Sequence, residues 1–159
     1  MTPKLLQACE FFQPAERACW EVLLREAGMP PAMSADAMRH AIARALQQLW
    51  SLLATRQLER WLEENPQPQE PLVPTTGCGV RPVLDFFASG ERALALILRE
   101  IGATQGGLPP AESGRLHEEI GQAFDILVHR ELEAVCGDCR HDPVCPLNGR
   151  RRCDGGAVA

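Results

Sequence analysis

Tyrosine is absent from this chain of 159 residues, and aromatic residues of all kinds make up only 5% of it. Strands are enriched in aromatic and β-branched residues, whereas Leu and Ala favour helices. With 45% apolar residues, the composition therefore predicts an all-α core. No apolar run approaches the roughly 18 residues needed to span a membrane, and the amino-terminal stretch has no features of a secretory signal. We therefore expect a cytoplasmic protein without a membrane partner.

Motifs of common enzyme chemistry are also missing. The sequence contains no glycine-rich nucleotide loop, no nucleophile elbow and no HExxH motif. The E-x-x-H pairs of di-iron bundles are absent as well. The net charge of −5 argues against nucleic acid as the partner, because that binding depends on neutralising phosphates. We therefore expect a protein that is not an enzyme.

Helix signals fill the first 64 residues. Thr2-Pro3 is a helix start signal, a capping hydroxyl followed by proline at the first helical position. Apolar residues then recur at helical spacing as far as Gly28, a residue suited to a C-terminal cap, and Pro14 is expected to break or kink this helix. Ser34 is expected to cap a second helix that continues through Glu64, about 31 residues or roughly 46 Å in length.

The second half of the chain repeats the first. The segment FFASGERALALILREIG (86–102) aligns with FFQPAERACWEVLLREAG (11–28) with a one-residue gap. Ser89-Gly90 is expected to interrupt the third helix where Pro14 interrupts the first. Two amphipathic hairpins cannot each bury their apolar faces alone, so the repeat predicts a four-helix bundle made by duplication. The expected parts are a first hairpin (1–64), a proline-rich connector (65–80), a second hairpin (81–135) and a cysteine-rich tail (136–159).

The tail holds four of the seven cysteines in the spacing C-x2-C-x5-C-x7-C. The last helix is expected to fray near Val135, so that these cysteines lie on a loop. In a reducing compartment such a pattern indicates metal ligation rather than disulfides. The predicted ligands are Cys136, Cys139, Cys145 and Cys153.

The spacing bears on which metal is bound. Structural zinc sites usually combine two short chelating pairs, and here the second pair is the long C-x7-C. Iron–sulfur clusters accept looser spacing, and Cys145 is followed by proline, as is the last ligand of bacterial ferredoxin motifs. The sequence therefore favours an iron–sulfur cluster, [4Fe–4S] in type. Zinc, held by the four cysteines or by three of them with His141, is the alternative.

The stretch CGDCRHDPVC resembles the C-x2-C-x5-C element of several iron–sulfur proteins. These include oxygen-sensing regulators of the fumarate–nitrate type, endonuclease III-like glycosylases and a nitrogen-fixation family thought to donate molybdenum. The resemblance covers ten residues and implies a cluster type rather than membership of a family. The fourth ligand in those families often lies upstream, whereas Glu131 and His129 stand at the corresponding positions here. Cys153 is the preferred fourth ligand, with Cys78 or His129 as alternatives.

Other polar and aromatic residues have simpler interpretations. Cys9 and Cys19 fall within apolar stripes and are expected in the core. The three tryptophans (Trp20, Trp50 and Trp61) are expected in the bundle core or a groove rather than as a stacking platform. Asp125, His129 and Glu133 share one helix face, which is either a solvated face with weak ion pairs or a proton-linked switch. Three arginines beside Cys153 could stabilise a negatively charged cluster.

These features predict an accessory or regulatory iron–sulfur protein with a metalloenzyme or regulator as its protein partner. Its role would be metal or cluster delivery, redox or oxygen sensing, or metalloenzyme maturation. The alternative is a zinc-stapled helical interaction module or chaperone without redox chemistry. The sequence leaves the pathway and the oligomeric state open.

Overall fold

The computed structural model describes residues 3–28, 33–55, 58–65, 71–73, 80–104 and 110–138, with the side chains at 3–12, 101–104, 110–112 and 136–138 left out. These residues form helices and contain no strand, so the predicted all-α class is confirmed. The helices are α1 (Pro3–Glu26), α2 (Ala35–Thr55), α3 (Leu58–Glu64), α4 (Val80–Thr104) and α5 (Pro110–Asp138).

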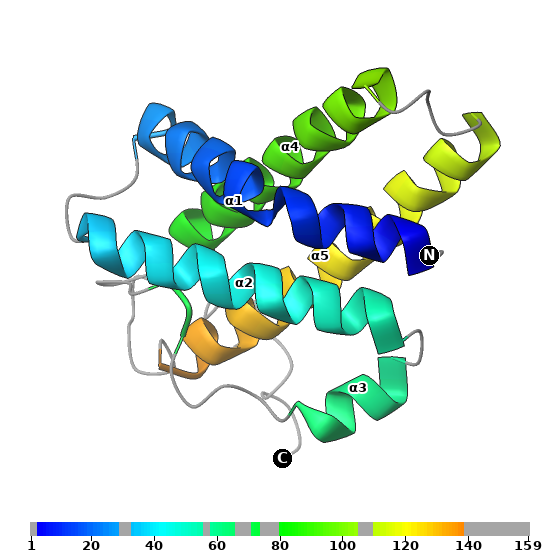
Figure 1. Ribbon diagram of the computed structural model, residues 1–159. Coiled ribbons are helices and arrows are strands. Elements are labelled where there is room, and N and C mark those ends of the chain that lie inside the picture. Colours follow the sequence, from blue (N-terminus) through cyan, green and yellow to red (C-terminus); the bar gives the residue numbers. More distant parts are fainter. Residues whose placement is uncertain are drawn as a thin grey trace, which may run out of the picture.

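The four long helices pack in a closed ring of contacts. α1 lies against both α2 and α4, and α5 lies against the same two helices (Figure 1). The short helix α3 packs on α2 and folds back beside its C-terminal end. The bundle-like arrangement buries the apolar stripe of each long helix between its neighbours.

The predicted helix ends between α1 and α2 are confirmed. Gly28 has φ 71° and its amide donates to the carbonyl of Arg25 at 3.2 Å, which closes the end of α1. The hydroxyl of Ser34 accepts a hydrogen bond from the amide of Ala37 at 3.1 Å, which caps the start of α2.

The predicted break at Pro14 and the predicted interruption at Ser89-Gly90 are wrong, because α1 and α4 run continuously through these positions. Pro14 lies inside α1 and is exposed. Ser89 lies inside α4, and its hydroxyl donates to the carbonyl of Asp85 at 2.8 Å. That bond satisfies the buried hydroxyl within the helix, so serine need not end it.

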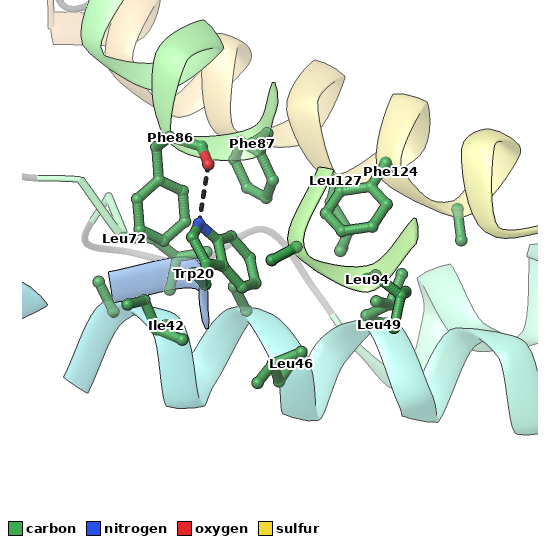
Figure 2. Close-up of a cluster of buried hydrophobic side chains, with 14 of the residues drawn as sticks. Trp20, Ile42, Leu46, Leu49, Leu72, Phe86, Phe87, Leu94, Phe124 and Leu127 are labelled. Carbon is green, nitrogen blue, oxygen red and sulfur yellow. Dashed lines mark hydrogen bonds between the residues drawn. The ribbon is translucent and has the colours of Figure 1, made fainter. Parts of the chain in front are cut away.

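Gly90 does not break α4. It allows α1 and α4 to pack closely against each other. A Cβ at this position would lie within 2.6 Å of three carbon atoms of the Trp20 indole. The same indole donates from Nε1 to the carbonyl oxygen of Phe86 at 2.9 Å, and its ring centroid lies 4.9 Å from that of Phe86 (Figure 2). Trp20 therefore fixes α1 on α4 at the centre of the core, where only glycine leaves room for it.

The predicted continuous helix from Ser34 to Glu64 is also wrong, since α2 ends at Thr55 and α3 is a separate helix. Trp61 supplies the reason, because its indole Nε1 donates to the hydroxyl of Ser51 at 3.1 Å. In one straight helix these residues would lie roughly 15 Å apart along the axis. Folding back allows the fully buried Trp61 side chain to leave water.

Helix α5 continues three residues beyond the expected end at Val135, and closes at Asp138. The backbone of Cys136 and Gly137 is therefore helical rather than part of a loop. One interior glycine weakens a helix by about 1 kcal/mol relative to alanine, which is too little to end a helix of 29 residues.

Candidate metal-binding end of helix α5

The first predicted ligand, Cys136, lies in the last turn of α5. Cys139 follows directly after the helix, and it lies outside the described residues together with Cys145, Cys153 and the alternative ligand Cys78. The structure therefore places one end of the C-x2-C pair and leaves the assembly of the four cysteines a prediction. In the described part of the chain, no group of three or more His, Cys, Asp and Glu side chains could hold a metal ion.

The alternative ligand His129 lies on the exposed face of α5, two turns before Cys136. Its Nε2 is 3.4 Å from the carboxylate of Glu133, and both side chains are largely exposed. Asp125 is exposed on the same face. The arrangement matches the solvated helix face with weak ion pairs that the sequence allowed.

Cys19, whose side chain the structure describes, is half-buried and packs against the core. Burial raises the pKa of its thiol above the ordinary value, partly opposed by the positive charge of Arg92. A raised pKa disfavours the thiolate that binds metals. Cys19 therefore fits the predicted core role, and the backbone of Cys9 lies in α1 with its side chain outside the described set.

Two buried charged residues near the end of α5 hold the segment that links the two hairpins. The guanidinium of Arg130 donates to the carbonyl of Asn65 at 2.6 Å and lies 4.8 Å from the centre of the Trp61 ring. The carboxylate of Glu131 accepts a hydrogen bond from the amide of Val73 at 2.9 Å. Together these contacts tie the start and the middle of the connector (65–80) to the helix that carries Cys136.

Burial of the Glu131 carboxylate carries a desolvation cost. Burial raises the pKa of its carboxyl, and the lowering contributions come from the backbone amides of Val73 and Leu72 and from the charge of Arg44. A glutamate that is 2% exposed with bound amides is a structural anchor. The sequence held a signal for it, because Glu131 falls four residues after Leu127 and four before Val135, on the apolar stripe itself.

A second buried glutamate, Glu16, lies on α1 at 1% exposure. Neither of its carboxylate oxygens has a hydrogen-bond partner, and the indole nitrogen of Trp50 on α2 is also buried without one. Sequence reasoning overlooked Glu16. The equivalent repeat position, Glu91, carries the same residue and is exposed in the structure, so the repeat by itself does not show that Glu16 is buried. The available signal was its place on the stripe, four residues before Trp20.

Comparison with known proteins identifies no family for this chain. No protein-family model, curated protein or solved structure matches this chain. Among the helices as far as they are described, none is long and apolar enough to cross a membrane.

Proposed function

We propose that this protein is an iron–sulfur-cluster-binding accessory or regulatory protein of the cytoplasm. A [4Fe–4S] cluster would be ligated by Cys136, Cys139, Cys145 and Cys153, and gain or loss of the cluster would order the tail and control docking on a protein partner. The supporting observation is the four-cysteine spacing, which starts on the last turn of a helix anchored to the rest of the fold.

We also propose that the helical body is a four-helix bundle derived from a duplicated hairpin. The internal repeat aligns α1 with α4, and these two helices pack on each other, as do the following helices α2 and α5. Contact between the equivalent members of two copies is the arrangement expected when one hairpin docks on its duplicate. α3 and the connector would be additions to the first copy.

The charge at the end of α5 fits a bound metal centre. The C-terminus of a helix carries a partial negative charge, which opposes nearby thiolates unless a cation neutralises them. A metal ion supplies that positive charge, and its binding keeps the cysteines deprotonated. A [4Fe–4S] centre with four thiolates remains negative, so the three arginines at 150–152 would complement it.

The anchoring of α5 would give the tail a fixed base. Arg130 and Glu131 lie six and five residues before Cys136, and both are buried. Because a helix rises 1.5 Å per residue, these contacts lie only about 8–9 Å from the first ligand along the axis. A cluster that orders the tail would therefore lie close to the contacts between α5 and the connector.

Anaerobic reconstitution with iron and sulfide tests the proposal. We expect a brown protein with visible charge-transfer absorption, and about four iron and four sulfide ions per chain. Cys136→Ser and Cys139→Ser should lose the absorption, while Cys19→Ala, which changes a core cysteine, should keep it. The replacement of Cys153 by Ser, compared with Cys78→Ser and His129→Ala, identifies the fourth ligand.

A colourless protein with one equivalent of zinc would refute the cluster and support the zinc-stapled interaction module. In that case the tail should lose its order with chelator, without any redox response. A protein that binds neither metal under these conditions would refute both forms of the proposal.

A further inference from the structure

Glu16 lies where a charge is costly. It is enclosed between α1 and its neighbours at 1% exposure, and both carboxylate oxygens lack hydrogen-bond partners. An ionised carboxylate without such partners loses its hydration energy on burial and recovers little of it. The folded arrangement therefore favours the neutral acid.

The surroundings of Glu16 do little to favour the ionised form. On α2, the Trp50 indole is close enough to oppose the rise in the Glu16 pKa, yet its N–H does not meet the geometry of a hydrogen bond. On α1, the neighbouring Arg17 acts as a positive charge but is itself exposed. On α4, the charge of Arg92 acts on Cys19, one turn away from Glu16.

The remaining charges between α1 and α2 are engaged further along the interface. Glu21 on α1 pairs with Arg25 on the same helix and lies 3.6 Å from Arg39 of α2. That ion pair is more than one turn from Glu16 and is partly exposed. Desolvation by burial is consequently the largest influence on Glu16, and it raises the pKa from 4.5 to about 8.

We propose that Glu16 is a proton-controlled latch, which holds this part of α1 on α2 while the carboxyl is protonated and releases it when the carboxyl ionises. The release is local, because Trp20 still joins α1 to α4 through its hydrogen bond to Phe86 one turn further on. Pro14 makes local opening of α1 easier, since it has no amide to complete the helical hydrogen bond to the residue four positions earlier. The latch is independent of the proposed metal site.

The direction of the pH effect follows from the two forms. In the open form Glu16 is hydrated and has its ordinary pKa, so it ionises well below the pH at which the closed form does. The closed form is therefore fully favoured below pH 4.5 and loses its advantage as pH rises to about 8. Over that interval the opening constant should rise about tenfold per pH unit, and it should level off above it.

Hydrogen exchange of the full chain, measured by mass spectrometry at pH 6 and pH 8 and corrected for intrinsic rates, tests the latch. We expect amides at 16–20 of α1 to lose roughly fiftyfold in protection between these pH values, and those at 116–124 of α5 to change little. Glu16→Gln, which stays neutral, should remove the pH dependence. Glu91→Gln changes the exposed repeat equivalent and should behave like the natural protein.

Glu16→Met provides a second neutral side chain, so the test remains decisive if the glutamine variant does not fold. Persistence of the full pH dependence in either neutral variant would overturn the proposal. Equal loss of protection in α1 and α5 would overturn it too, because opening would then be global. The second buried acid, Glu131, contacts Val73 and stays in every variant, so its own titration cannot account for a difference between them.

Discussion

Gly90→Ala is the change for which the structure gives the sharpest expectation. Alanine would place its Cβ within 2.6 Å of three indole carbon atoms of Trp20. Carbon atoms in good contact are about 3.5–4.0 Å apart, so the helices must separate or the indole must turn. Neither is free, because the indole is 1% exposed and hydrogen-bonded to Phe86.

The expected change in the free energy of unfolding combines one stabilising and two destabilising contributions. Alanine in place of glycine favours a helix by about 1 kcal/mol. Overpacking a well-filled core costs about 1–3 kcal/mol, and loss of the Trp20 hydrogen bond costs about 1 kcal/mol more. We therefore expect a net loss of about 2 kcal/mol in the free energy of unfolding.

Urea denaturation followed by circular dichroism at 222 nm measures this loss, and two other glycines serve as controls. Gly121 in α5 has as its nearest contact a Glu91 carboxylate oxygen 3.9 Å from the added Cβ, and Gly114 has nothing within 4 Å. Alanine at either position should leave stability unchanged or raise it by up to about 1 kcal/mol. The sign of the effect thus separates Gly90 from glycines in the same kind of helix.

A double-mutant cycle with Trp20→Leu isolates the contact. With the indole removed, Gly90→Ala should no longer destabilise the protein, and the two changes should be non-additive by about 1–3 kcal/mol. The reasoning fails if Gly90→Ala is as stable as the Gly121→Ala control, or if its cost persists unchanged in the leucine background.

Three further changes test separate parts of the fold by the same urea assay. Ser34→Ala removes the cap of α2 and should cost about 1 kcal/mol, whereas Ser34→Asp should restore most of it; equal stability of all three proteins would contradict the capping role. Gly28→Ala forces a side chain into φ 71° with nothing nearby to clash, so backbone strain alone should cost about 1 kcal/mol. Arg130→Met keeps the apolar stem but leaves the Asn65 carbonyl without its donor, so we expect a loss of about 1–3 kcal/mol and faster hydrogen exchange in α3; unchanged exchange there would contradict the anchoring.

Pattern-based interpretation found the helix class, the cap at Ser34 and the glycine end at Gly28, because each depends on neighbouring residues. It also placed the three tryptophans in the core or a groove, and all are buried in the core at less than 9% exposure. It failed at Ser89-Gly90, where a local rule suggested a break. Gly90 is required by the indole of Trp20, 70 positions earlier in the chain, so the residues of α4 alone could not explain it.

The two buried glutamates show the same difference between what a local pattern predicts and what the tertiary contacts decide. Glu16 and Glu131 could have been noticed as acids on apolar stripes, but the stripe does not tell what each one meets. Glu131 receives the amide of Val73 across 58 positions, while Glu16 receives no hydrogen bond. The same residue type is consequently an anchor on α5 and a strained group on α1.

The sequence by itself determined the helical class, the end of α1 at Gly28 and the start of α2 at Ser34, since periodicity and caps act over a few residues. The metal chemistry of the tail stays a prediction from its cysteine spacing. Only the tertiary structure decided that α3 turns back to bury Trp61, that Gly90 admits Trp20, and that one of two repeated glutamates is enclosed. The physical reason is that burial and close contact depend on surfaces brought together from distant parts of the chain, and their free energies exceed local preferences.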